Sequence, residues 1–123
     1  MEGESADVKK VKSLAFAIRI VNLCKYLKSK HKDMSIISKQ LFRSGTSIGA
    51  NIAEAEYAES QVDFVHKLRI SLKEASETTY WLKLLHALKV LNDSQFESMI
   101  NDCQQLVKIL TAIIETSNSN SQL

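Results

Sequence analysis

The charged and amide side chains that could build a polar site lie in two stretches of the sequence, residues 43–54 and 74–77. Arginine presents a planar fork of donors that carboxylates can accept in pairs, and asparagine can bridge a donor and an acceptor. Two interpretations stay open: a polar pocket for a ligand or nucleic acid, or an ion-pair network that fixes helix register and oligomer geometry. We favour the structural network. Its predicted members are Arg43, Asn51, Glu54, Glu74 and Glu77.

Metal-binding and nucleophilic chemistry find little support. A di-metal site in a helical bundle needs two Glu-x-x-His motifs and two further glutamates, whereas this chain has one Asp63-x-x-His66 pair. Hydroxyl groups cluster at Ser44, Thr46 and Ser47, but no histidine lies near them in the sequence and no strand–turn–helix pattern surrounds them. We therefore expect no enzymatic activity, catalytic residue, metal, cofactor or small-molecule substrate.

The composition indicates one helical domain. The 123 residues include no proline and only three glycines, and 45% are hydrophobic, as is typical of helices joined by short turns. No apolar run approaches the roughly 20 residues of a membrane span. The first seven residues are acidic and lack the apolar core of a signal peptide, so we expect a cytoplasmic protein. Cys24 and Cys103 fall at apolar helical positions, which predicts reduced, buried thiols.

Charge is distributed unevenly along the chain. Residues 1–50 carry ten lysines and arginines against four acidic residues, whereas residues 51–123 carry six against ten. Such an asymmetry marks either a basic binding face or helices that complement one another inside a bundle. If it is a binding face, phosphate groups are the expected ligands. The candidate nucleic-acid-binding residues are Lys12, Arg19, Tyr26, Lys30 and Lys39.

Hydrophobic periodicity predicts four helices, at about residues 7–30, 33–55, 60–90 and 94–116. Asp33 or Ser35 could cap the second helix, and Ser60 with Asp63 forms a capping box at the start of the third. A further capping box at Ser94 should begin the fourth helix, and residues 117–123 should form a disordered polar tail.

Two small residues in the second helix, Gly45 and Gly49, lie four positions apart and so share one face. Each glycine costs a helix about 1 kcal/mol relative to alanine. Close backbone packing against a neighbouring helix is the expected compensation, so we predict that another helix approaches this face.

The first and third predicted helices are apolar on two opposite sides. In the first helix, the stripe from Val11 to Val21 lies about 180° from the stripe that begins at Phe16. A monomer needs one buried face per helix, so the second faces predict a homo-oligomer; a bundle wide enough to bury both sides is the alternative. The predicted interface residues are Phe16, Ile20, Leu23, Leu27, Ile70, Trp81, Leu84 and Leu88.

Two blocks of sequence, Arg43-Ser-Gly-Thr-Ser-Ile-Gly-Ala-Asn51 and Lys73-Glu-x-x-Glu-x-x-Tyr-Trp-Leu82, resemble motifs of a known family. Over roughly residues 8–116 the chain is similar to the bacterial four-helix bundle proteins called 23S rRNA intervening-sequence proteins. These are related to the accessory proteins of diversity-generating retroelements. Many relatives have Ser-Ile-Pro-Ser-Asn in the first motif, whereas Gly49 stands at the position of that proline.

The resemblance implies a pentameric ring and a nucleic-acid partner, RNA or DNA. Genes of some relatives lie inside insertions in large-subunit ribosomal RNA genes, and the retroelement accessory proteins bind nucleic acid and a reverse transcriptase through basic surfaces. We therefore predict an all-α, antiparallel up-down four-helix bundle over residues 1–116, assembled as a cytoplasmic homopentamer. It would bind structured nucleic acid or a nucleoprotein partner without catalysis. The alternative is a protein-interaction scaffold that docks a partner helix and binds no nucleic acid.

Overall fold

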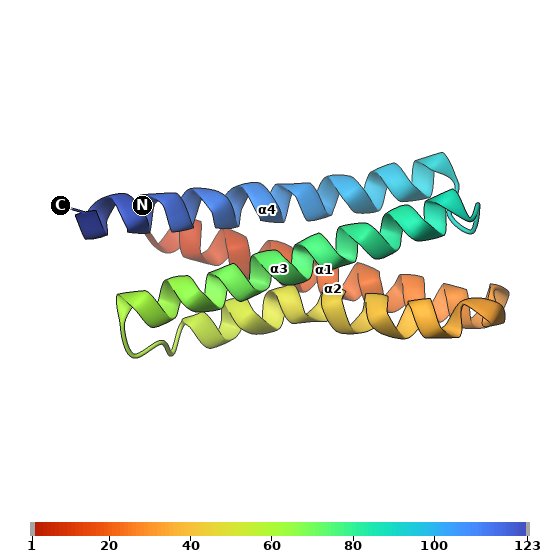
Figure 1. Ribbon diagram of the computed structural model, residues 1–123, viewed down its shortest axis with the longest axis horizontal. Helices are drawn as coiled ribbons and strands as arrows, with labels where there is room; N and C mark the ends of the chain where they lie inside the picture. Colours follow the sequence, from red (N-terminus) through yellow and green to blue (C-terminus); the bar gives the residue numbers. More distant parts are fainter. Residues whose placement is uncertain (1, 123) are drawn as a thin grey trace.

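The computed structural model describes residues 2–122, and side chains within residues 8–118. Four long helices run alternately up and down: α1 (Glu2–Lys30), α2 (Ser35–Ala55), α3 (Gln61–Ala87) and α4 (Asp93–Gln122) (Figure 1). A single 3-10 turn, η1 (Lys32–Met34), joins α1 to α2. The described residues contain no strand, so the predicted all-α fold is confirmed. None of the described helices is long and apolar enough to cross a bilayer.

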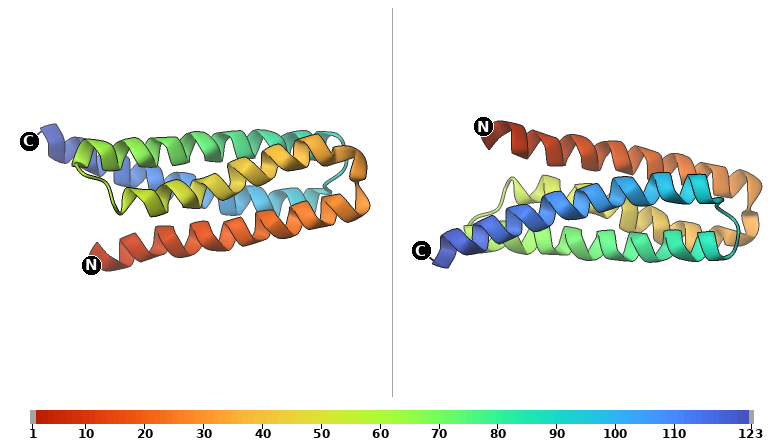
Figure 2. Two further views of the ribbon diagram at one scale, coloured as in Figure 1. Left: turned by 90° about the horizontal axis from the view of Figure 1, so that it is seen from below. Right: turned by 90° about the horizontal axis from the view of Figure 1, so that it is seen from above.

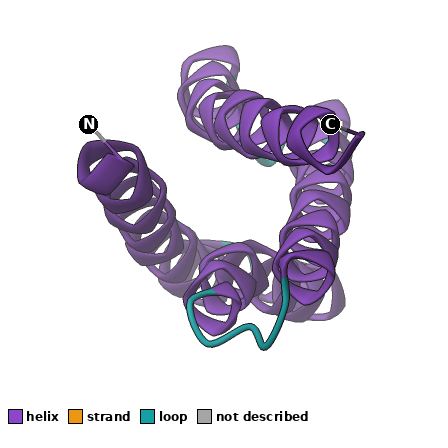
Figure 3. Cartoon of the chain, turned by 90° about the vertical axis from the view of Figure 1, so that its left-hand side faces the viewer, coloured by secondary structure: helices purple, strands orange, loops and turns teal. Residues whose placement is uncertain are grey.

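Each helix packs against its two neighbours around a square, but the four pairs are packed unequally. The α1–α2, α2–α3 and α3–α4 pairs are closely packed, whereas α1 and α4 touch least. The two helices diverge toward the end of the bundle that carries both chain termini (Figures 2 and 3). The opposite end holds the α1–α2 and α3–α4 turns.

The helix ends show which local signals the sequence carries. Ser60 caps α3 as predicted, since its hydroxyl oxygen accepts a hydrogen bond from the backbone N–H of Asp63 at 3.0 Å. The other predicted caps are wrong. Met34 occupies the N-cap of α2, where no side chain makes a capping hydrogen bond. At the start of α4, Asn92 and Gln95 exchange side-chain and backbone hydrogen bonds of 2.8 and 2.9 Å, two residues earlier than the box predicted at Ser94.

The third helix also ends earlier than predicted. Lys89, with φ of 63°, takes the left-handed conformation that commonly closes a helix, and the N–H of Val90 donates to the carbonyl of Leu85 at 2.9 Å. The fourth helix ends later than predicted. It continues through Ser117, whose side chain is 7% exposed, as far as Gln122. The disordered tail predicted to begin at Ser117 is therefore helical over the described residues, and Leu123 lies outside them.

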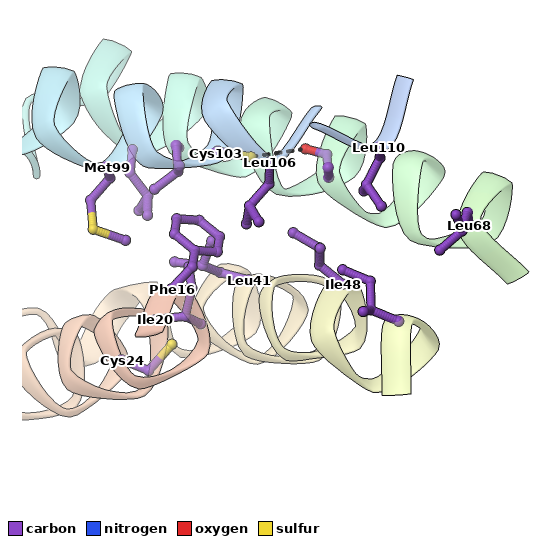
Figure 4. Packing of buried hydrophobic residues seen from close by; sticks show 14 of the residues in the cluster. Phe16, Ile20, Cys24, Leu41, Ile48, Leu68, Met99, Cys103, Leu106 and Leu110 are labelled. Carbon is purple, nitrogen blue, oxygen red and sulfur yellow. Dashed lines mark hydrogen bonds between the residues drawn. The ribbon is translucent and has the colours of Figure 1, made fainter. Parts of the chain in front are cut away.

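The core corrects the prediction for the first helix. Phe16, Ile20 and Leu27, which the prediction places in an oligomer interface, are at most 2% exposed. Figure 4 shows Phe16 and Ile20 pointing into the bundle. The opposite stripe lies on the surface, where Val11 and Leu14 are 65% and 64% exposed. The two faces of α1 are apolar in the same way, so spacing alone could not tell which one turns inward.

The third helix follows the prediction more closely. Its expected core residues Leu68, Ala75 and Leu82 are fully buried. On its other side, Leu88 is 50% exposed, and Ile70, Trp81 and Leu84 are half-buried, as is Leu23 on α1. An apolar surface therefore remains on both α1 and α3.

The glycine face of α2 receives α1, as its spacing predicts. A Cβ atom added to Gly45 would lie 2.7–2.9 Å from three side-chain carbons of Ile20, closer than van der Waals contact allows. At Gly49 the corresponding distances, all to Ser13, are 3.3–3.4 Å. Gly45 is thus the residue that permits the close approach, and Gly49 leaves more room.

Candidate nucleic-acid interface

The predicted polar network forms around Arg43, between α2 and α3. Its guanidinium donates to Glu74 at 3.0 Å and pairs with Glu77, which also accepts a hydrogen bond of 2.9 Å from the indole N–H of Trp81. Gln40 on the preceding turn accepts from the arginine Nε at 3.3 Å. Arg43 and Trp81 hold the pKa of Glu77 below its usual value through these hydrogen bonds, and Glu77 raises the pKa of Arg43.

This arrangement links α2 to α3 at the protein surface. The side chain of Arg43 is 48% exposed, and its guanidinium pairs with the carboxylates of Glu74 and Glu77. Two predicted members lie elsewhere. The amide of Asn51 donates to the carbonyl of Ser47 in its own helix, and Glu54 pairs with Lys67 at 3.8 Å.

A buried row of hydroxyl groups, which was not predicted from the sequence, links the same two helices. Thr78 donates to the Ser44 hydroxyl oxygen at 2.9 Å, and Ser71 donates to the carbonyl of Ile48 at 2.8 Å. All three hydroxyl residues are fully buried. The sequence contained a signal that could have predicted these hydroxyl contacts. Ser71 and Thr78 lie seven residues apart, so they share the face of α3 that carries the core residue Ala75. Ser44 therefore has a packing role.

The remaining candidate nucleophiles and ligands lie apart. Thr46 and Ser47 donate to carbonyls one turn earlier in α2, at 2.7 and 2.5 Å. Cys24 and Cys103 are free and buried, and burial raises the pKa of both thiols. Within the part of the chain that is described, no three His, Cys, Asp or Glu side chains lie close enough to hold a metal ion.

The predicted basic surface is divided in the structure. Lys12 and Arg19 reach from α1 across to α4, where Lys12 donates to Gln105 at 2.9 Å and Arg19 pairs with Asp102 at 2.6 Å. Arg19 also donates to the Ser98 hydroxyl at 2.8 Å. Lys12 and Arg19 therefore link α1 to α4, the pair of neighbouring helices with the least contact. The carboxylate of Asp102 already neutralises Arg19.

The other predicted residues lie around the α1–α2 turn. Lys30 and Lys39 are exposed there, and the ring of Tyr26 contacts that of His31 with centroids 5.6 Å apart. Three further lysines join them. We call this set the basic end of the protein: Lys25, Lys28, Lys30, Lys32 and Lys39.

The ammonium groups of the basic end have no acidic partner within the part of the chain whose side chains are described. Among the described residues, none of them forms an ion pair or a hydrogen bond. At the far end of the bundle, by contrast, Lys10 pairs with Glu56 and Lys67 with Glu54. Lysines at the end of α1 complement the helix dipole, but the dipole does not neutralise five charges. Positive charge therefore accumulates at one end of the bundle.

A groove with a volume of about 610 Å³ opens in the same region, between α1 and α2. Its apolar lining comes from Val21, Cys24, Leu27 and Phe42. Four of the five lysines of the basic end also line it: Lys25, Lys28, Lys32 and Lys39. We refer to it as the α1–α2 groove.

Fold and site together define a four-helix up-down bundle with a basic end whose lysines form no ion pair with any described residue. A family model described as 23S rRNA-intervening sequence protein matches residues 7–112, and the chain belongs to this family. Its structure is similar to the 1.70 Å crystal structure of a protein of unknown function from the S23 ribosomal protein family of Bacteroides thetaiotaomicron VPI-5482. The two are 51% identical, the match covers 90% of this chain and 98% of that one, and the TM-score is 0.86. The search of curated proteins finds no match to this sequence.

Proposed function

We propose that this protein is a non-enzymatic homo-oligomer that binds nucleic acid through its basic end. The observation that carries the proposal is the cluster of five lysines without acidic partners among the described residues. Phosphates neutralise such clusters and release counterions, which gives affinity that depends on salt and little on sequence. The family description, which refers to an insertion in ribosomal RNA, agrees with a nucleic-acid partner.

Assembly would increase the effect of this cluster. Val11, Leu14 and Ile18 form an apolar strip on α1 with exposures of 54–65%, and monomers seldom leave such a strip uncovered. We propose that a second copy covers it, using the outer side of α3 at Ile70, Trp81, Leu84 and Leu88 for the complementary contact. The family resemblance implies five subunits, and each subunit would add one basic end.

The test compares two charge reversals of equal size. In one variant, Lys25, Lys28 and Lys32 become glutamate; in the control, Lys73, Lys83 and Lys108 on the surfaces of α3 and α4 become glutamate. Fluorescence anisotropy with labelled structured RNA and duplex DNA should show loss of binding in the first variant and near-normal binding in the second. Equal losses would mean that only net charge matters. Absence of binding by the unmodified protein at low salt would favour the protein-interaction scaffold.

A further inference from the structure

The α1–α2 groove has an apolar lining that phosphate binding does not explain. Lysines that contact a phosphate backbone need only an exposed surface, yet here they surround a concave site. Phe42, at the groove wall, is 46% exposed, although a phenylalanine of a bundle helix is ordinarily buried. Val21 is half-buried, and Cys24 and Leu27 close the floor. The groove therefore offers apolar contact and positive charge side by side.

We propose that the α1–α2 groove binds unpaired nucleotides, with bases stacked on Phe42 and phosphates held by the surrounding lysines. This inference rests on the proposed nucleic-acid function and adds the class of substrate. A single strand exposes the flat faces of its bases, which stack on aromatic side chains, while lysines follow its backbone. In a duplex those faces are covered by neighbouring base pairs, so a duplex could contact the lysines and leave the groove empty.

The dimensions of the groove agree with this ligand. Its α1 wall runs from Val21 to Lys28, about 10 Å along a helix that rises 1.5 Å per residue. Bases stack about 3.4 Å apart, so two or three of them fit this length. Lys25 and Lys28 on one wall, with Lys32 and Lys39 on the other, place positive charge on both sides of a strand lying between the helices.

The aromatic character extends past the groove. His31 lines it, and the ring of His31 contacts that of Tyr26 on α1. Tyr26 is 38% exposed, so a strand leaving the groove over the end of α1 meets a second ring. Aromatic and basic side chains interleaved in this way are typical of surfaces that bind single strands without sequence preference.

The experiment separates base contacts from phosphate contacts with three labelled probes. They are a twelve-nucleotide oligouridine, a duplex with mixed sequence, and an abasic strand with the same number of phosphates as the oligouridine. We expect the oligouridine to bind at least about 5-fold tighter than the abasic strand, because stacking of even one base contributes that factor. Equal affinity for these two strands would overturn the proposal.

Variants assign the base contact to Phe42. Phe42→Ala should weaken oligouridine binding about 5- to 100-fold and leave the duplex and abasic affinities unchanged. Phe42→Trp should retain the affinity, which guards against a merely structural effect of the alanine. Tyr57→Ala, at an 84% exposed aromatic position after the other end of α2, is the matched control and should bind as the unmodified protein does.

The outcomes distinguish the two proposals. If all probes bind equally and Phe42→Ala has no effect, the basic end binds nucleic acid but the groove takes no bases. If no probe binds at low salt, the proposed function itself fails. Binding of an acidic amphipathic peptide, with every oligonucleotide failing, would assign the groove to a protein partner and overturn this inference.

Discussion

Replacement of Gly45 by alanine tests the close approach of α1 and α2. The new Cβ would lie 2.7 Å from Cγ1, 2.8 Å from Cδ1 and 2.9 Å from Cγ2 of Ile20. Because Ile20 is fully buried, its side chain has no open space into which it could rotate. Overpacking of this kind costs about 1–3 kcal/mol, and the better helix propensity of alanine returns about 1 kcal/mol. We therefore expect the free energy of unfolding to fall by up to about 2 kcal/mol.

Gly49→Ala is the matched control, in the same helix and against the same neighbour. The nearest atoms to its Cβ, all of Ser13, lie at 3.3–3.4 Å, so a shift of a few tenths of an ångström accommodates the methyl group. Helix propensity should then dominate, and the variant should be up to about 1 kcal/mol more stable than the unmodified protein. Urea denaturation followed by circular dichroism, at one fixed protein concentration, measures both changes.

A double-mutant cycle attributes the effect to Ile20. Ile20→Ala removes all three carbons that the new methyl group would approach, at a cost of about 2–5 kcal/mol by itself. In that background Gly45→Ala should be stabilising, by about 1 kcal/mol, because only the propensity effect and some cavity filling remain. The reasoning is refuted if Gly45→Ala destabilises equally in both backgrounds, or if it stabilises the unmodified protein.

Three further predictions concern the helix end, the ion pair and the exposed strip. Lys89→Gly should raise the unfolding free energy by about 0.5–1 kcal/mol in urea, because glycine adopts a φ of 63° without strain; an unchanged midpoint would contradict this. The hydrogen bond from Arg43, with a second from the neighbouring indole, lowers the pKa of Glu77. The stabilisation that this interaction gives the folded protein is therefore complete above the pKa of about 4 that Glu77 has in the unfolded chain. It is lost as the pH falls through the lower pKa that Glu77 has in the folded protein. Glu77→Gln should accordingly flatten the decline in melting temperature between about pH 5 and pH 3, and an unaltered decline would show that the ion pair does not contribute to it. Leu14→Asp with Ile18→Asp should reduce the mass measured by light scattering while helix content is kept; an unchanged mass would exclude this strip as the interface.

The sequence predicted the fold well because periodicity reports which residues share a helix face. Leu68, Ala75 and Leu82 of α3 lie in the core as expected. The spacing of Gly45 and Gly49 also predicted a close helix approach, because residues four apart necessarily lie on one side of a helix. Both signals depend only on residues close together in the chain, so the sequence alone is enough to read them.

The orientation of α1 could not be read in the same way, because both of its stripes are apolar. A finer signal was present, since the stripe from Val11 to Val21 continues into Lys25 and Lys28, and a core stripe seldom ends in charge halfway along a bundle. The stripe that begins at Phe16 stays apolar through Leu27, and it is the one that is buried. Toward the N-terminus the same buried face carries Ser13 and Lys9, which are 3% and 5% exposed, so this signal applies only to the C-terminal half of α1.

The basic surface was predicted only in part, because a lysine or arginine can bind phosphate only if no acidic side chain of the protein already pairs with it. Lys12 and Arg19 share a flank of α1, but that flank turns toward Gln105 and Asp102 of α4, which are distant in the chain. Lysines near the α1–α2 turn form no ion pair among the described residues, and Asp33 is the one carboxylate between residues 25 and 42. Local sequence could have identified this second set.

The salt dependence of duplex binding tests the central claim most directly. The slope of log affinity against log salt concentration becomes shallower by about 0.9 for each phosphate that the protein no longer neutralises. If the basic end holds the nucleic acid, replacing Lys25, Lys28 and Lys32 with glutamine should therefore reduce the slope. The same replacements at Lys73, Lys83 and Lys108 should leave it unchanged. Equal slopes in both variants and the unmodified protein would contradict the claim that this end of the bundle binds phosphate.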